Sequence, residues 1–306
     1  NEFSSPTLNK ELNENLTNIK KSIILPLGEV KLTRKIKSLS IIFRTNTNIE
    51  IWDQNKKRIF EKPKIEYALR CLNSLIKSIK KVKEKKPDTL IKLQVIDDNS
   101  NDENLKKIKD LINSNRIDCE IINHNKSEHK EKIAAENNDE TFGNLSSLLK
   151  CFEIAKKEQS DLIYFVEDDY LHYDHSLVDM LDTYERISSQ HKDEIIVCPS
   201  DYPFNYMTNE KTNILIGSRQ HWRIITKMLC TFMISKKTFQ KHINNFEKTC
   251  EKRHDPFEKY LNEILQKEVA ISPIDSLAIH LTNVNSSYGL SPFVDCKKLW
   301  EENKVD

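Results

Sequence analysis

The chain has 306 residues, of which 38% are hydrophobic and 31% are charged. Lys and Arg number 48 and Asp and Glu number 47, so the formal net charge is +1 and gives no electrostatic reason to expect binding to nucleic acid or an anionic membrane. This length suffices for one sizeable α/β domain or two small ones. The four glycines almost exclude a glycine-rich phosphate loop.

The seven cysteines are scattered along the chain and form no C-x-x-C pair. Such a set indicates reduced thiols, and we therefore expect a cytoplasmic location, with peripheral attachment to a membrane left open. No apolar run approaches the roughly 20 residues that a transmembrane helix needs, so no transmembrane segment is predicted.

Strands and helices alternate in the first two thirds of the chain. Residues 1–35 are polar and are predicted to form an extension, helical around residues 8–22. The loop 124–140 shows no periodicity and is expected to be solvated. Strands are predicted at 38–44, 90–96, 119–122, 161–166 and 195–198, and helices from Pro63 past Ile79 and at 102–113, 143–157 and 175–187. This alternation favours a largely parallel sheet covered by helices on both faces.

The pattern after residue 200 is more mixed. Strands are predicted at 214–218, 229–234 and 277–281, a helix at 255–266 that Asp255 and Pro256 open, and a last helix at 295–303. The sequence contains neither an internal repeat nor a linker between residues 38–200 and the later residues, which favours a single compact domain.

Charged and polar side chains follow three of the predicted parallel strands. The first strand ends in Arg44-Thr45-Asn46, the second in Asp97-Asp98, and the fourth in Glu167-Asp168-Asp169. Ligands of an open parallel sheet bind beyond the carboxyl ends of its strands. A divalent cation can join such carboxylates to a diphosphate and stabilise charge on it as it leaves. The alternative is that these residues are solvated turns.

The segments "SLSIIFRTNTN", "LQVIDDNSND" and "DLIYFVEDDYLH" resemble, in this order, the nucleotide-sugar glycosyltransferases of the GT-A fold, particularly family 2. The resemblance covers residues 38–170. It implies an α/β, Rossmann-like, mostly parallel sheet flanked by helices over residues 36–306, with a nucleotide-donor half at 36–170 and an acceptor half at 171–306. It also implies a nucleoside-diphosphate sugar as donor, a hydroxyl-bearing acceptor and Mn²⁺ or Mg²⁺ as cofactor.

The resemblance also implies roles for individual residues. Arg44 and Thr45 would face the nucleotide, and Asp97 or Asp98 would bind its base. Glu167 would stand at the first position of the D-x-D metal motif, one methylene longer than the usual Asp. Asp168 would contact the ribose or the donor sugar. Metal binding would fall to Asp169 and His280, and Asp255 would be the base that deprotonates the acceptor. Inversion at the sugar carbon is the habit of this family.

Several of these residues have a second interpretation. Asp255 is equally suited to cap a helix ahead of Pro256. Asp201 is a rival base or a turn residue, and His280 a metal ligand or a buried structural histidine. The aromatic residues of the segment 202–222 form either an acceptor wall or core anchors: Tyr202, Phe204, Tyr206, His221 and Trp222.

Two other functions fit the same pattern. A nucleotidyltransferase would use similar metal-binding carboxylates, but it usually carries a glycine-rich basic loop after its first strand, which this chain lacks. A GT-A-like domain that has lost catalysis would bind a glycan or a protein partner instead.

Overall fold

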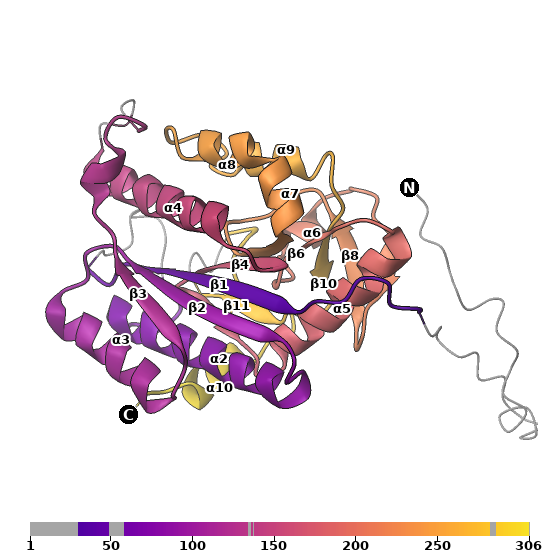
Figure 1. Cartoon of the computed structure of the whole chain (residues 1–306), viewed down its shortest axis with the longest axis horizontal. Coiled ribbons are helices and arrows are strands. Elements are labelled where there is room, and N and C mark those ends of the chain that lie inside the picture. The colour runs from indigo at the N-terminus through magenta and orange to yellow at the C-terminus, as the bar shows by residue number, and fades with distance from the viewer. Residues whose placement is uncertain (1–29, 49–57, 134–135, 137, 282–285, 306) are drawn as a thin grey trace, which may run out of the picture.

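The computed structural model of the chain describes residues 30–48, 58–133, 136, 138–281 and 286–305. Within these ranges one central sheet has the strand order β3-β2-β1-β4-β9-β6-β10-β8-β7 (Figure 1). Its nine strands are β1 (Ser38–Thr45), β2 (Leu90–Asp97), β3 (Cys119–Asn123), β4 (Leu162–Glu167), β6 (Ile196–Val197), β7 (Ile214–Ile216), β8 (His221–Ile225), β9 (Phe232–Ser235) and β10 (Ala270–Pro273).

The sheet is mixed but mostly parallel, as the sequence predicts. β1 pairs in parallel with β2 and β4, and β2 does so with β3. β9 runs antiparallel to β4 and β6, β10 is parallel to β6, and β8 is antiparallel to β10 and β7. Following these pairings across the described strands, only β8 and β9 run against the other seven. Both reversals fall after residue 200, where strands and helices no longer alternate.

Helices cover both faces of the sheet (Figure 1). The core on one face is shared with α2 (Lys64–Lys85), α3 (Asp102–Ser114), α5 (Ser176–His191) and α10 (Cys296–Glu302). The core on the other face is shared with α4 (Asp139–Lys157), α7 (Lys236–Lys241), α8 (Ile243–Thr249) and α9 (Lys259–Ile264). Two short elements, the 3₁₀ helix η1 (Lys126–His129) and α6 (Phe204–Met207), complete the helices of the described ranges.

Strand β1 is buried on both sides, which explains its continuous apolar run. Ile41 and Phe43 point to the face covered by α2, α3, α5 and α10, called here the α2 face. Ile42 between them points to the face covered by α4, α7, α8 and α9, called the α4 face. Because successive side chains of a strand alternate between faces, the polar residues that end β1, β2 and β4 are also divided between the two faces.

A second, two-stranded sheet lies apart from the central one. It pairs β5 (Tyr170–His172) with β11 (Ala278–His280) in antiparallel orientation. The sequence predicts the strand around residues 277–281 but not its partner. Three residues directly after an acidic cluster are too few for a recognisable strand pattern.

The helix predicted at 255–266 is shorter than expected. α9 begins only at Lys259, with Glu258 as the preceding residue, and the Asp255–Pro256 peptide bond is cis. Asp255 therefore does not cap this helix, and that interpretation is wrong. The predicted helix at 143–157 instead begins earlier, at Asp139, because the Asn138 side chain accepts a hydrogen bond from the backbone N–H of Thr141.

The loop expected to be solvated after β3 is also partly buried. His124, His129 and Ile133 are at most 2% exposed. The hydroxyl of Ser146, in α4, lies 2.8 Å from a ring nitrogen of each histidine. Besides β5, the elements that the sequence analysis did not predict are η1, α6, β8, α7, α8 and β10.

Most of the predicted N-terminal extension, including the helix around residues 8–22, lies outside the described residues. Its final residues contact the domain. The backbone N–H groups of Thr33 and Arg34 donate to the Ser189 hydroxyl at the end of α5, and that of Ile36 donates to the Glu185 carboxylate.

Candidate active site

The polar ends of β1, β2 and β4 meet at one edge of the central sheet. In the parallel register, Thr45 pairs with Asp97 and Arg44 pairs with Glu167. The sequence prediction that these three strand ends gather is therefore confirmed. Their side chains form two groups, one on each face of the sheet.

On the α4 face, Arg44 holds Glu167. One Arg44 nitrogen donates to Glu167 Oε1 at 2.5 Å, and the other donates to the Asn144 carbonyl at 3.0 Å and to Ser147 Oγ at 3.2 Å. Burial raises the pKa of Glu167, Asp169 raises it further, and Arg44 opposes both effects. Arg44 thus links strand β4 to helix α4. Among the described residues, Arg44 does not line the cavity described below, which Glu167 faces.

Asp98 belongs to the same face. Its Oδ2 accepts a hydrogen bond from Asn46 Nδ2 at 3.2 Å, and burial raises its pKa. A Cβ atom on Gly143 would lie 3.4 Å from this carboxylate, so the start of α4 packs closely against it.

On the α2 face, Asp168 is surrounded by donors. Its Oδ2 accepts from Thr45 Oγ1 at 2.8 Å and from the Asn46 N–H at 3.2 Å, and its Oδ1 accepts from Lys64 Nζ. Sequence reasoning did not identify Lys64. Its position at the start of α2 gives no signal, because the contact depends on how α2 packs beside β4. These three donors fix the position of the Asp168 side chain.

Asp97 lies beside Asp168 on this face. Its Oδ2 accepts from the Ser100 N–H at 3.1 Å, whereas its Oδ1 is buried with no hydrogen-bond partner in the described residues. Burial raises the pKa of Asp97, and the charge of Asp168 raises it further. The carboxylate is therefore a polar group that a ligand donor would satisfy.

The small sheet brings Asp169 and His280 together. The Leu281 N–H donates to the Asp169 carbonyl at 2.9 Å, and His280 Nε2 lies 3.3 Å from Asp169 Oδ2. His280 Nδ1 lies 2.7 Å from the Tyr288 carbonyl, which can only accept, so Nδ1 carries a proton. Nε2 is therefore the nitrogen that faces Asp169: it donates to the carboxylate when it is protonated, and it would offer a lone pair to a cation when it is not. Burial opposes charge on His280, but Asp169 raises its pKa overall.

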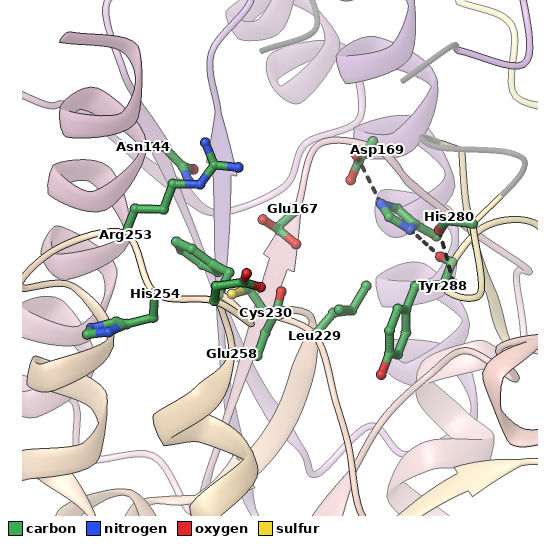
Figure 2. Close-up of a pocket in the computed structure, with 13 residues that line it drawn as sticks. Asn144, Glu167, Asp169, Leu229, Cys230, Arg253, His254, Glu258, His280 and Tyr288 are labelled. Atoms are coloured by element: carbon green, nitrogen blue, oxygen red, sulfur yellow. Dashed lines mark hydrogen bonds and ion pairs between the residues drawn. The ribbon is translucent and has the colours of Figure 1, made fainter. Parts of the chain in front are cut away.

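A cavity of about 640 Å³ opens where these groups meet (Figure 2). Glu167, Asp169 and His280 line it from the strand ends, and Arg253, Leu229 and Tyr288 lie around its wall. Two further carboxylates, Asp255 and Glu258, line it from the segment before α9. The alternation of β4 explains why Glu167 and Asp169 face this cavity while Asp168 points away.

The predicted catalytic residues differ in their positions. Asp255 is exposed and lines the cavity. Glu258, which sequence reasoning missed, lines it too, and its place three residues after Asp255 is the only signal. Asp201 is 2% exposed, is not among the lining residues, and accepts hydrogen bonds from Tyr206 Oη and from Asn205 Nδ2. The structure does not bring Asp201 to the cavity.

The aromatic segment 202–222 is mostly structural. Trp222 is fully buried and Tyr202 is 4% exposed, so neither forms an open wall. Tyr206 is exposed but pairs with Asp201 and Arg223. Two of these rings pack against residues of the cavity: Phe204 stacks on Tyr288, and Tyr202 packs edge-on against Tyr288 and His280.

Three findings concern metal binding, membranes and the cysteines. In the described ranges, no three His, Cys, Asp or Glu side chains are arranged to hold a metal ion by themselves. No described helix is both long and apolar enough to span a bilayer. All seven cysteines are free thiols.

Comparisons with known proteins complete the description. No protein-family model matches the sequence, and no curated protein is similar to it. Residues 1–349 of S. aureus TarS match with a TM-score of 0.45 and 13% identity, over 79% of this chain and 59% of that chain. The same protein in complex with UDP matches with a TM-score of 0.42 and 14% identity over the same shares.

The galactosyltransferase LgtC, in complex with donor and acceptor sugar analogs, has a TM-score of 0.35 and 12% identity over 74% of this chain and 66% of that chain. This chain therefore spans less than two thirds of the length of each of these proteins. The similarity is distant and concerns the fold; at such scores it carries no argument about activity.

Proposed function

We propose that this protein is a metal-dependent glycosyltransferase that moves a sugar from a nucleoside diphosphate to a hydroxyl acceptor. The observation that supports this function is the cavity at the carboxyl ends of the strands. There, the Asp169–His280 pair lies with three further carboxylates, those of Glu167, Asp255 and Glu258. The resemblance of the strand-end motifs to GT-A enzymes points to the same chemistry, and residues 36–170 and 171–306 would serve donor and acceptor respectively.

Asp169 and His280 are suited to hold Mn²⁺ or Mg²⁺. One carboxylate and one imidazole with its Nε2 lone pair available supply two ligands, and oxygens of a diphosphate and water can complete the coordination of such a cation. When bound, the cation would stabilise negative charge on the departing diphosphate. The Tyr288 carbonyl keeps the imidazole in the required tautomer.

The nucleotide would lie over the ends of β1, β2 and β4. Asp97, whose Oδ1 has no hydrogen-bond partner among the described residues, or Asp98 would accept hydrogen bonds from the base. Thr45 and Lys64 would hold Asp168 beneath the ribose. Arg44 would act indirectly, through the position of Glu167.

Asp255 would remove the proton from the acceptor hydroxyl. The oxygen would then attack the anomeric carbon as the bond from that carbon to the diphosphate oxygen breaks, and the diphosphate would leave with the electron pair. This single displacement inverts the anomeric configuration, and a carboxylate on the acceptor side is a sufficient base. Glu258 is the rival, since it lines the same cavity.

A transfer assay tests the proposal. Purified protein would be incubated with a panel of nucleotide sugars and Mn²⁺, and both transfer and slow donor hydrolysis would be followed. We expect one donor to be consumed and its nucleoside diphosphate to raise the melting temperature in a metal-dependent way. If no donor is consumed and no nucleotide shifts the melting temperature, the proposal is wrong.

One observation favours a second candidate, a GT-A-like domain that binds without catalysis. Lys64 already satisfies one oxygen of Asp168, the acidic residue expected to bind the donor. Replacing Asp169 with Asn separates the two functions: the enzyme would lose its activity, whereas a binding domain would keep its affinity for its glycan or protein partner. The free thiols are consistent with the reducing, cytoplasmic location expected in either case.

A further inference from the structure

Tyr288 presents an aromatic ring to the cavity next to the candidate metal ligands. Its side chain is half-buried and lies beside Leu229 on the cavity wall (Figure 2). Tyr288 and Leu229 give this part of the wall apolar surface, and the carboxylates of Glu167, Asp169 and Glu258 line the same cavity. A cavity that combines apolar and acidic side chains suits a molecule with an apolar face and hydroxyl groups on its edge.

The Tyr288 ring is supported from behind by a second ring. It stacks on Phe204 with a centroid distance of 5.2 Å and an angle of 10°, and Tyr202 packs edge-on against it at 5.5 Å. The Phe204 N–H also donates to the Ser287 carbonyl at 2.7 Å, and Lys227 Nζ lies 4.5 Å from the centre of the Phe204 ring. Contacts from both main chain and side chains therefore fix the plane of Tyr288 before any ligand binds.

We propose that the Tyr288 ring is the platform on which a pyranose packs with its C–H face, and that Phe204 is the residue that positions this ring. The inference rests on the proposed function and deepens it, because it names the part of the substrate that the apolar wall recognises. The pyranose is either the sugar of the donor or a sugar of the acceptor. Both present the same face, and the experiment below distinguishes them.

The role of the ring can be separated from the metal site. His280 is held by the backbone carbonyl of Tyr288, not by its side chain. A substitution at residue 288 therefore removes the ring and keeps the hydrogen bond that fixes the His280 tautomer. Sugar binding and metal binding should respond differently to the same variant.

Calorimetry and saturation-transfer NMR on the full chain provide the test. The probes are Mn²⁺ with UDP, Mn²⁺ with a panel of UDP-sugars, and a panel of methyl pyranosides. The variants are Tyr288→Ala, Tyr288→Phe and Phe204→Leu. Phe293→Ala is the matched control, because Phe293 is 98% exposed and does not line the cavity.

Tyr288→Ala should weaken pyranose binding roughly tenfold, as the loss of one ring contact predicts. Tyr288→Phe and the control should bind as the wild type does, and Phe204→Leu should show a smaller loss. Binding of Mn²⁺ with UDP should stay within about twofold in all variants. A loss confined to UDP-sugars assigns the platform to the donor, and a loss confined to methyl pyranosides assigns it to the acceptor.

Three results would overturn the inference: wild-type binding of every pyranose by Tyr288→Ala, an equal loss of UDP affinity in that variant, or no pyranose binding by the wild type. The proposed function fails separately. If the wild type binds methyl pyranosides through Tyr288 but neither nucleotide nor Mn²⁺, the platform stands and the transferase assignment falls.

Discussion

At the scale of single residues, the acidic cluster after β4 has divided roles. Glu167 and Asp169 face the cavity, and Asp168 points to the other face, where Lys64 and Thr45 hold it. The sequence alone predicts the cluster and its chemistry, but not this division, because the contacts come from helices that are distant in sequence. Lys64 was missed for the same reason, and Glu258 and Tyr288 were missed because only the folded chain brings them to the cavity.

Asp169→Asn should abolish metal-dependent activity with little effect on folding. Asn keeps the size of the side chain but removes the charge that a divalent cation requires, so we expect a loss of at least about 100-fold in Mn²⁺ affinity and in turnover. Calorimetric titration with Mn²⁺ in the presence of a nucleoside diphosphate measures the first and the transfer assay the second. Asp174→Asn, at an exposed position of the same segment, is the control. Unchanged Mn²⁺ affinity would remove Asp169 from the metal site.

Asp255→Asn should lower kcat by about 10²–10⁴-fold, the usual contribution of a general base, and leave nucleotide affinity unchanged. Glu258→Gln should lower kcat less than tenfold. Asp201→Asn should act on stability, since Asp201 is buried against Tyr206 and Arg223. The kcat of each variant is measured by steady-state kinetics at saturating donor, and its nucleotide affinity is measured separately. A larger loss in Glu258→Gln would transfer the role of base to that residue.

At the scale of elements, the strands that form the site were predictable and the segments that surround it were not. β1, β2 and β4 are long, apolar and buried on both faces, so their composition identifies them. Of the two three-residue strands β5 and β11, the sequence predicts β11, whereas β5 is identified only by its pairing with β11. The Asp-Pro signal predicts a helix from residue 255, but α9 begins only at Lys259, so Asp255 lies in an exposed loop before it.

Helix α2 gives a prediction at this scale. Lys64 is at the N-terminal end of the helix, where a positive charge is unfavourable, and its pair with Asp168 offsets this cost. Lys64→Met should therefore leave a buried carboxylate without its cation and destabilise the fold by about 3 kcal/mol. Urea denaturation measures the change.

Lys81→Met is the matched control on the same helix. Its partner Glu84 is largely exposed, so the loss of that pair should cost less than about 1 kcal/mol. Equal effects of the two substitutions would show that the Lys64–Asp168 pair has no special part in the fold.

At the scale of the whole molecule, two buried histidines make stability depend on pH. Burial lowers the pKa of both His124 and His172 to about 4, below the ordinary value of 6.5. Between these values the unfolded chain binds more protons than the folded one, so stability should fall as the pH is lowered from 6.5 to 4.

His172→Gln should make this dependence shallower. Gln cannot take up a proton, and it retains polar groups near Tyr164 and the Tyr170 carbonyl, the partners of His172. Urea midpoints of wild type and variant at several pH values between 4 and 7 measure the slope, with His221→Gln, at an exposed position, as the control. Parallel curves for wild type and His172→Gln would contradict the prediction.

The place of β9 has a consequence for dividing the molecule. This strand comes from the later part of the chain, yet it lies between β4 and β6 and pairs with residues 162–165. A fragment that ends at residue 170 would leave one side of β4 with open backbone donors and acceptors, an edge that recruits other chains. We therefore expect the first 170 residues, expressed alone, to aggregate, and recovery of a soluble fragment would require co-expression of the remainder.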